Sequence, residues 1–246
     1  MIGQPITQFS SPLALVLLPG LDGTGQLFKW LLDALPSGLE PTVVSFPKDR
    51  DGDYSALETH VVRLLPQDRP FAILGESFSG PLALRLAANG YKNLVAVVLV
   101  ASFVNRPVAW MPDFVRHILR PWMFRLPIQI PLRWFLLGSQ PPTAMIADTM
   151  KCLRSVDPAV LAARTKAALE VDATKAFVEC PVPILYLGGQ QDRLVAFQTA
   201  ERMKSLRPNL ECVMLDGPHF VLQRSPIAAA QAIAGFLGRH HPKTGI

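Results

Sequence analysis

The sequence is poor in cysteine and in charged residues, and it has no long hydrophobic run. Three of its 246 residues are cysteines, at positions 152, 180 and 212, and none of them belongs to a C-x-x-C pair. That number is too small for a disulfide framework, and the spacing does not fit a cysteine metal site. We therefore expect buried free thiols in a reducing compartment and no bound metal.

The apolar run at residues 13–18 is far shorter than the about 20 residues that a membrane span requires. Ahead of it there is neither a basic stretch nor a small-residue cleavage site of the kind that marks a signal peptide. Half of the residues are hydrophobic and 17% are charged, which is typical of a folded domain with a large core. We expect a soluble, cytoplasmic protein made of one domain with an insertion.

The net charge of +5 is distributed unevenly along the chain. Residues 102–175 contain 10 Lys and Arg against 5 Asp and Glu, whereas the rest of the chain contains 14 of each kind. A uniformly basic surface, as expected for a nucleic-acid-binding domain, therefore does not describe this chain. We expect no nucleic-acid partner.

Outside this middle segment, short apolar strands alternate with amphipathic helices. Strands are expected at residues 13–18, 42–46, 71–74, 94–100, 182–187 and 210–215, and helices at 26–35, 54–65, 81–88, 197–206 and 226–237. Strands that are apolar on both faces and alternate with helices are typical of a mainly parallel sheet with helices on both faces. The sequence therefore predicts an α/β fold of this type.

The middle segment interrupts the alternation with five prolines between positions 107 and 131. Two helices are expected after them, at residues 143–154 and 158–169. We interpret residues 104–177 as a helical cap, or lid, inserted into a core formed by residues 1–103 and 178–246.

The cap contains aromatic side chains, among them Trp110, Phe114 and Trp122. They could line an apolar acyl pocket and bind substrate, contact an anionic membrane surface, or simply pack against one another inside the cap. The arginines of the cap would also attract anionic substrates, such as acyl groups that end in a carboxylate.

The hexapeptide GESFSG at residues 75–80 carries the strongest sign of chemistry. It lies between an expected strand and an expected helix, so Ser77 would occupy a sharp strand-to-helix turn. Such a turn presents a serine nucleophile in a strained backbone conformation, and it requires small residues two positions away, here Gly75 and Ser79. The alternative is an ordinary serine-rich turn. We favour Ser77 as a nucleophile that a base activates.

Of the five histidines, His219 is the one placed to act as that base. It follows the strand expected at 210–215, at the sheet edge where catalytic groups collect in α/β proteins. Asp192 follows the strand expected at 182–187 and reaches the same edge, where a carboxylate can orient the imidazole. The alternatives are a structural loop histidine, an Asp192 that caps the next helix, and Asp216 as the orienting carboxylate.

A glycine-rich loop, PGLDGTG at residues 19–25, follows the first expected strand. In a serine hydrolase such a loop supplies one backbone N–H to the oxyanion, and the residue after the nucleophile supplies the other. We assign these two donors to Leu21 and Phe78. A phosphate-binding loop is the alternative, although the sequence matches neither G-x-G-x-x-G nor a P-loop with its lysine.

The glycine-rich loop, the GESFSG turn and the pair of Asp192 and His219 together resemble the α/β-hydrolase superfamily. The resemblance covers nearly the whole chain, and the insertion stands where cap domains usually occur. With a serine at position 77, the chain resembles the esterase, lipase and acyl-transfer branch. Other branches use an aspartate as the nucleophile. The sequence departs from the common pattern at Pro19, where many members have histidine, and at Ser79, where glycine is usual. The resemblance implies no metal and no organic cofactor.

These residues predict a serine hydrolase that cleaves a carboxylic ester with an apolar acyl group, through an acyl-enzyme on Ser77. Two alternatives stay open: an acyltransferase with the same residues and an alcohol acceptor, and a non-catalytic ligand-binding protein on the same fold. The expected partner is a small ester or acyl substrate, with peripheral membrane contact through the basic aromatic cap as a further expectation. The oligomeric state is left open.

Overall fold

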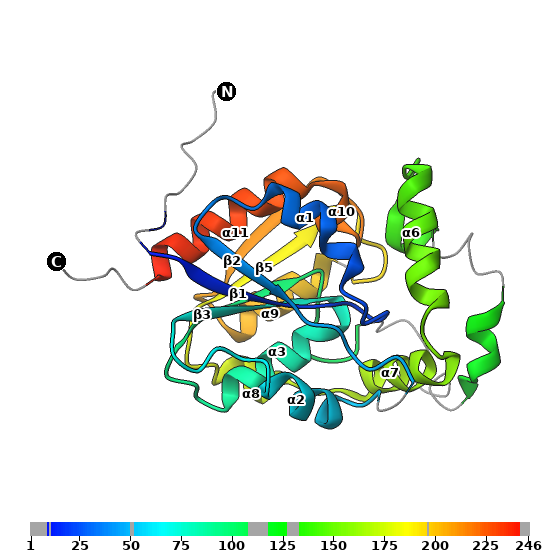
Figure 1. Cartoon of the computed structure of the whole chain (residues 1–246), viewed down its shortest axis with the longest axis horizontal. Coiled ribbons are helices and arrows are strands. Elements are labelled where there is room, and N and C mark those ends of the chain that lie inside the picture. Colours follow the sequence, from blue (N-terminus) through cyan, green and yellow to red (C-terminus); the bar gives the residue numbers. More distant parts are fainter. Residues whose placement is uncertain are drawn as a thin grey trace.

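A six-stranded parallel β-sheet forms the centre of the molecule (Figure 1). The computed structural model describes residues 9, 11–49, 52–107, 118–126, 133–195 and 197–241. The strands, in the order β2-β1-β3-β4-β5-β6 across the sheet, are β1 (Leu13–Leu18), β2 (Leu39–Val43), β3 (Phe71–Glu76), β4 (Leu94–Val100), β5 (Ile184–Gly189) and β6 (Glu211–Leu215). The predicted α/β fold with a parallel sheet is confirmed.

Residues along the central strands alternate between two hydrophobic clusters, one on each face of the sheet. In β1, the even-numbered residues from Ala14 to Leu18 belong to one cluster, and the odd-numbered residues from Leu13 to Leu17 belong to the other. All of them are fully buried. Because successive side chains of a strand point to opposite faces, burial on both faces accounts for the unbroken apolar run in the sequence.

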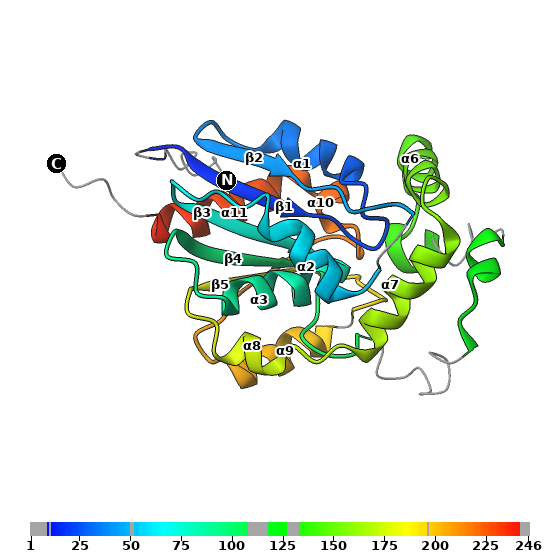
Figure 2. The ribbon, with the colours of Figure 1, turned by 60° about the horizontal axis from the view of Figure 1, so that its bottom comes forward.

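Two layers of helices cover these faces (Figures 1 and 2). One layer contains α1 (Lys29–Ala34), which follows the short helix η1 (Gln26–Phe28), together with α10 (Val221–Arg224) and α11 (Pro226–His240). The other contains α2 (Tyr54–Val62), α3 (Gly80–Ala88), α8 (Thr174–Val178) and α9 (Phe197–Leu206). Because the strands are parallel, their carboxyl ends all reach the same edge of the sheet.

Among its described residues, the chain between β4 and β5 also forms helices beyond this edge of the sheet (Figure 2). They are η3 (Pro121–Arg125), η4 (Arg133–Leu137), α6 (Thr143–Arg154) and α7 (Pro158–Glu170). The side chain of Asp157 accepts a hydrogen bond from the amide of Ala159 at 2.7 Å, which explains why α7 begins where it does. The two helices predicted in this segment are present, α6 with the predicted bounds and α7 one residue longer.

β2 and β5 lie at positions shifted from those predicted. β2 begins at Leu39 rather than at residue 42, because Leu39 pairs with Leu13 at the start of β1. β5 extends to Gly189 rather than ending at residue 187, because the glycines still pair with β6. Strand ends are set by the pairing partner, which the local sequence does not contain.

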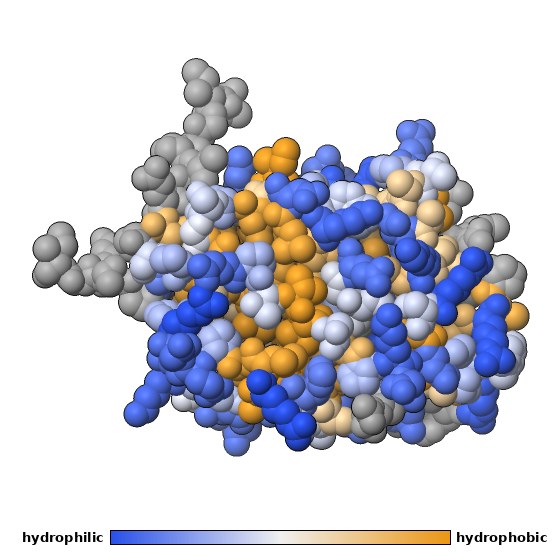
Figure 3. Space-filling model, in the orientation of Figure 1, coloured by the Kyte–Doolittle hydropathy of each residue, from blue (hydrophilic) through white to orange (hydrophobic). Residues whose placement is uncertain are grey.

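On the face shown in Figure 3, hydrophobic residues form a band across the middle, with hydrophilic residues on both sides. Among the described residues, no helix is both long enough and apolar enough to pass through a bilayer. The location of the protein in the cytoplasm stays a prediction.

Candidate active site

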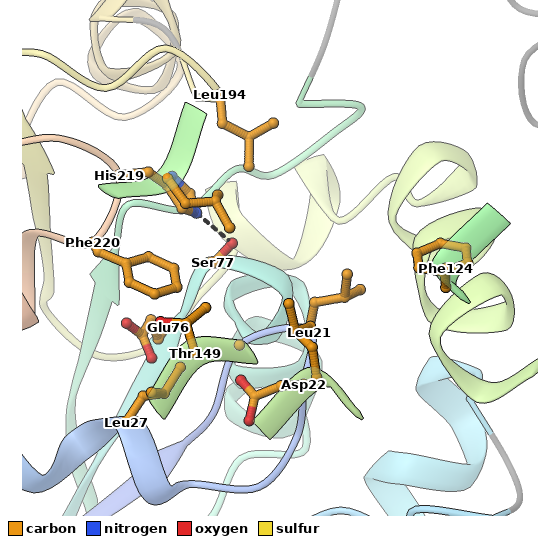
Figure 4. Close-up of a pocket in the computed structure, with 13 residues that line it drawn as sticks. Leu21, Asp22, Leu27, Glu76, Ser77, Phe124, Thr149, Leu194, His219 and Phe220 are labelled. Carbon is orange, nitrogen blue, oxygen red and sulfur yellow. Dashed lines mark hydrogen bonds between the residues drawn. The ribbon is translucent and has the colours of Figure 1, made fainter. Parts of the chain in front are cut away.

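Ser77 lies at the sharp turn between β3 and α3, at the carboxyl end of the sheet (Figure 4). Its backbone φ is 49°, in the left-handed region that a non-glycine residue adopts only at an energetic cost. A side-chain carbon on Gly75 would lie 2.6 Å from the carbonyl oxygen of Ser79, so only glycine fits at that position. The predicted strained turn is therefore present, and close packing explains the small residue that precedes it.

Ser79 and Gly80 join this turn to its neighbours. The hydroxyl of Ser79 donates a hydrogen bond to the carbonyl oxygen of Pro19. The two departures from the usual superfamily pattern thus contact each other, and they tie the turn to the glycine-rich loop. A side-chain carbon on Gly80 would lie 1.8 Å from Oγ of Ser102, whose hydroxyl donates to the carbonyl oxygen of Ser77 at 2.6 Å. Ser102 therefore holds the backbone of Ser77, and Ser79 holds the turn against the glycine-rich loop.

Ser77, His219 and Asp192 form a line of hydrogen bonds. Oγ of Ser77 lies 2.8 Å from Nε2 of His219, and Nδ1 of His219 lies 2.8 Å from Oδ2 of Asp192. The side chains of His219 and Asp192 are each only 2% exposed. The three residues that the sequence places at one edge of the sheet meet there, although each of them follows a different strand.

Asp192 is fixed by the backbone that follows it. Its Oδ1 accepts hydrogen bonds from the amides of Leu194 and Val195, each at 2.8 Å. Its Oδ2 is therefore the oxygen that faces the imidazole. Asp216, the alternative carboxylate, instead accepts a hydrogen bond from the side chain of Gln191. Asp192 thus stabilises a local turn and contacts His219 at the same time.

His219 reaches this position because its loop passes close to the end of β5. A side-chain carbon on Gly189 would lie 2.3 Å from the carbonyl oxygen of Pro218. The amide of Phe220 donates to the carbonyl oxygen of Leu136 at 3.0 Å, which joins the loop to η4. A larger residue at position 189 would push the loop and its imidazole away from Ser77.

Two titratable groups beside Ser77 are buried. Burial lowers the pKa of His219, but the charge and hydrogen bond of Asp192, with the charge of Glu76, outweigh this effect and raise the pKa above the usual 6.5. Glu76 precedes Ser77 and accepts a hydrogen bond from Nε2 of Gln223 at 2.9 Å. Burial raises the pKa of Glu76 to about 7, so its charge changes near neutral pH.

Arg164 of α7 fastens the glycine-rich loop. Its fully buried guanidinium donates hydrogen bonds to the carbonyl oxygens of Leu21 and Asp22, both at 2.9 Å, and of Pro47 at 2.7 Å. Burial lowers the pKa of Arg164 to about 10, whereas the charge of Asp22 acts to raise it. A side-chain carbon on Gly23 would lie 2.4 Å from Nη1 of Arg164, so the loop accommodates the guanidinium only with glycine there. Arg164 was not predicted from the sequence.

Replacing Arg164 with methionine is expected to lower the free energy of unfolding by about 2–4 kcal/mol, because three buried carbonyl groups lose their donor. Urea denaturation followed by circular dichroism measures the change. Arg154→Met removes an exposed arginine from α6 and is the matched control, with an expected change below about 0.5 kcal/mol. Equal stabilities of the two variants would contradict the structural role of Arg164.

Phe78, the residue after Ser77, is held by Tyr54 of α2. The two rings stack with centroids 4.8 Å apart and an interplanar angle of 15°. The hydroxyl of Tyr54 donates to the carbonyl oxygen of Phe78 at 2.8 Å. Burial raises the pKa of Tyr54 far above its usual value, so the donor keeps its proton. The orientation of Phe78 is thereby fixed.

A cavity of about 180 Å³ lies beside Ser77 (Figure 4). Its polar lining residues are Ser77, His219, Glu76, Asp22 and Thr149. The rest of the wall is apolar apart from backbone groups, and it consists of Gly20, Leu21, Leu27, Phe124, Leu136, Leu153, Leu194 and Phe220. Because η3, η4 and α6 each contribute to this wall, the segment between β4 and β5 covers part of the site.

A model of the alpha/beta hydrolase family matches residues 15–232, which is most of the chain. The chain belongs to this family. Membership agrees with the resemblance seen in the sequence and supports a hydrolase as the class of enzyme. No curated protein shows significant similarity to this alpha/beta hydrolase at the level of sequence.

Several solved structures share the fold of this alpha/beta hydrolase. A malate-bound thermophilic esterase from Thermogutta terrifontis is 18% identical, with a TM-score of 0.79 over 95% of this chain and 92% of the esterase. An esterase from Exiguobacterium antarcticum is 15% identical, with a TM-score of 0.78 over 92% of each chain. A bromoperoxidase from Bacillus anthracis is 17% identical, with a TM-score of 0.76 over 94% of this chain and 93% of its own. At such low identities the likeness shows the fold alone.

Of the three aromatic residues expected to bind substrate, the structure describes only Trp122, which lies away from the cavity. Trp110 and Phe114 lie outside the described residues. Trp122 is 59% exposed and does not line the cavity, whereas Phe124, two residues later in η3, does. In Figure 4, Phe124 lies on the far side of the cavity from Phe220. The proline-rich segment has no regular period from which the inward-facing side chain could be predicted.

The described part of the chain includes side chains of the types that ligate metals, and it includes all three cysteines. No group of three or more His, Cys, Asp and Glu side chains is arranged there to hold a metal ion. All three cysteines are free, and Cys152 and Cys180 are buried as expected. Cys212 is exposed, contrary to the expectation, because β6 is an edge strand of the sheet.

Proposed function

We propose that the chain is a serine esterase that cleaves a carboxylic ester with an apolar acyl group through an acyl-enzyme on Ser77. The observation that carries this proposal is the line of hydrogen bonds from Ser77 through His219 to Asp192, beside a largely apolar cavity. A serine hydroxyl becomes an effective nucleophile when a neighbouring base removes its proton. A carboxylate on the other ring nitrogen orients that base.

In the first half-reaction, Oγ of Ser77 attacks the carbonyl carbon of the ester while Nε2 of His219 accepts the hydroxyl proton. The bond between that carbon and the alcohol oxygen then breaks, and His219 gives the proton to the departing oxygen. In the second half-reaction, water attacks the acyl-enzyme with His219 as base, and Ser77 recovers its proton as the acid leaves. Asp192 accepts a hydrogen bond from Nδ1–H of His219 throughout without taking the proton, so Nε2 is free to accept the serine proton and the imidazolium is stabilised.

Each tetrahedral intermediate carries negative charge on the former carbonyl oxygen, and we assign the backbone N–H groups of Leu21 and Phe78 as its donors. Leu21 lines the cavity, and its own carbonyl is held by Arg164. Phe78 is held by Tyr54. Donors that are fixed before the reaction need no reorganisation when the charge develops, which is why such contacts from remote helices favour catalysis.

A fluorophosphonate is expected to label the folded protein at a single residue, Ser77, because only an activated serine attacks it rapidly. Mass spectrometry of the digested protein identifies the labelled peptide. Ser77→Ala is expected to remain unlabelled. Ser205→Ala, which removes an exposed hydroxyl from α9, is the control and should be labelled like the wild type. Labelling at another residue, or none in the folded protein, would overturn the assignment.

Acyl transfer to an alcohol is a second candidate function, and the apolar wall of the cavity favours it. A wall of this kind keeps water away from the acyl-enzyme, so that an alcohol can accept the acyl group instead. Product analysis with an ester substrate and an excess of a medium-chain alcohol separates the two reactions. A new ester would indicate transfer, whereas free acid as the sole product would exclude transfer to that alcohol.

A further inference from the structure

The cavity beside Ser77 limits the length of an acyl chain. Its volume is about 180 Å³. An apolar protein cavity of roughly 150 Å³ holds one benzene molecule, which has six carbon atoms. A chain of about six carbons therefore fills the space next to Ser77. Leu27, Leu194 and Phe220 are among the apolar side chains that such a chain would contact.

The charges in the wall limit the kind of chain. The 13 lining residues include no lysine or arginine, but they include two acidic side chains, Asp22 and Glu76, each 7% exposed. Arg164 lies behind the wall and donates to backbone carbonyl groups rather than into the cavity. Among the described residues that line this space, a substrate carboxylate would therefore meet two acidic side chains and no lysine or arginine.

We propose that the cavity binds a short, uncharged acyl chain and that Glu76 selects against acyl groups ending in a carboxylate. The inference rests on the proposed esterase function, in which Ser77 attacks the ester beside this cavity. Glu76 directly precedes Ser77, and its Oε1 is held by Nε2 of Gln223 at 2.9 Å, so its carboxylate is fixed in the wall. Two like charges repel strongly where apolar walls leave little water to screen them.

This specificity is the reverse of the one that the cap arginines suggest in the sequence. The described part of the middle segment contributes no basic side chain to the cavity wall. Its lining residues are Phe124, Leu136, Thr149 and Leu153. The acidic groups come instead from the loop after β1 and from the end of β3. The charge of the chain as a whole therefore does not describe the charge that a bound acyl group meets.

The selection is expected to depend on pH, because Glu76 has a pKa of about 7. Burial is the main cause of the raised pKa, the charge of Asp22 adds to it, and Gln223 and His219 act against it. Below this pKa Glu76 is mainly neutral, and above it mainly ionised. A substrate carboxyl with an ordinary pKa of about 4–5 stays ionised throughout. The repulsion should therefore grow with rising pH.

The test compares p-nitrophenyl hexanoate with the mono-p-nitrophenyl ester of adipic acid, which has the same chain length but ends in a carboxylate. The readout is the ratio of the two kcat/KM values, neutral ester over acidic ester. In the wild type we expect a ratio above about 10 at roughly pH 8.5 and a several-fold smaller ratio at roughly pH 6. A dodecanoate ester is expected to react more slowly than the hexanoate, because it exceeds the cavity.

Glu76→Gln is the informative variant, because glutamine has a similar shape and no charge. At the higher pH its ratio is expected to be about tenfold below that of the wild type, and the pH dependence of the ratio should disappear. A general loss of activity affects both esters and cancels in the ratio. Glu201→Gln removes an exposed carboxylate from α9 and should keep the ratio and pH dependence of the wild type.

A wild-type ratio near one at both pH values, or a Glu76→Gln ratio equal to that of the wild type, would overturn the inference and leave the esterase proposal intact. If neither ester reacts and Ser77 is inert to the fluorophosphonate, the esterase proposal fails and the inference fails with it. Should Glu76→Gln not fold, the pH dependence of the ratio in the wild type decides the question.

Discussion

Replacing Ser77 with alanine is expected to lower kcat for ester hydrolysis by about 10⁴- to 10⁶-fold. The change removes Oγ, the atom that lies 2.8 Å from Nε2 of His219 and that would attack the ester. The rate that remains would come from the backbone donors of Leu21 and Phe78 and from substrate binding. Steady-state kinetics with the hexanoate ester measures the effect.

The fold of this variant is expected to survive. Alanine is smaller than serine, and its Cβ places the same strain on a backbone with a positive φ. Thermal denaturation checks that expectation. Ser205→Ala again serves as the control, since the exposed hydroxyl on α9 contacts only a neighbouring backbone carbonyl. A Ser77→Ala enzyme that keeps more than a tenth of the wild-type kcat would exclude Ser77 as the nucleophile.

Asp192→Asn is expected to lower kcat by about 10⁴-fold with little change in the fold. Oδ1 of Asp192 accepts hydrogen bonds from the amides of Leu194 and Val195, so the oxygen of an asparagine would keep that place. Its amide nitrogen would then face Nδ1 of His219 and donate to it. The ring proton would then lie on Nε2, the nitrogen that faces Ser77. The imidazole could therefore no longer accept the serine proton.

The same substitution is expected to shift the pH dependence of the reaction. The base must be unprotonated, so kcat/KM in the wild type should fall as the pH drops through the pKa of His219, which lies above 6.5. Without the charge of Asp192 this pKa falls, and the midpoint of the profile should move to lower pH. Asp216→Asn is the control, because its side chain contacts Gln191 and not His219. Its kcat and pH profile should match the wild type.

The positions of Ser77, Asp192 and His219 could be predicted because each depends on local sequence and on one general rule. An apolar run followed by a glycine-rich or polar loop marks the carboxyl end of a buried strand. In a parallel sheet these ends lie at one edge, whichever strands are neighbours. This prediction does not depend on the order of the strands in the sheet. Ser77 and His219, 142 positions apart in the sequence, could therefore be assigned to one site without knowledge of the distance between them.

Arg164 and Glu76 could not be identified as functional in the same way. Arg164 lies in α7, and an arginine in a helix is usually exposed to solvent. Its burial depends on three backbone carbonyls that come from two other loops. Glu76 stands at a position of the turn for which the sequence pattern requires no particular residue. Its burial depends on the packing of α10 against the turn, through Gln223.

The sequence by itself determined the parallel α/β architecture and the three residues of the hydrogen-bonded line, because hydrophobic periodicity and strand-end position are local properties of the chain. The tertiary structure alone decided the character of the cavity: its size, its apolar wall with Phe124 rather than Trp122, and its two acidic groups. A cavity wall is assembled from side chains of distant segments. Which of them face inward depends on how those segments pack, and no local pattern carries that information.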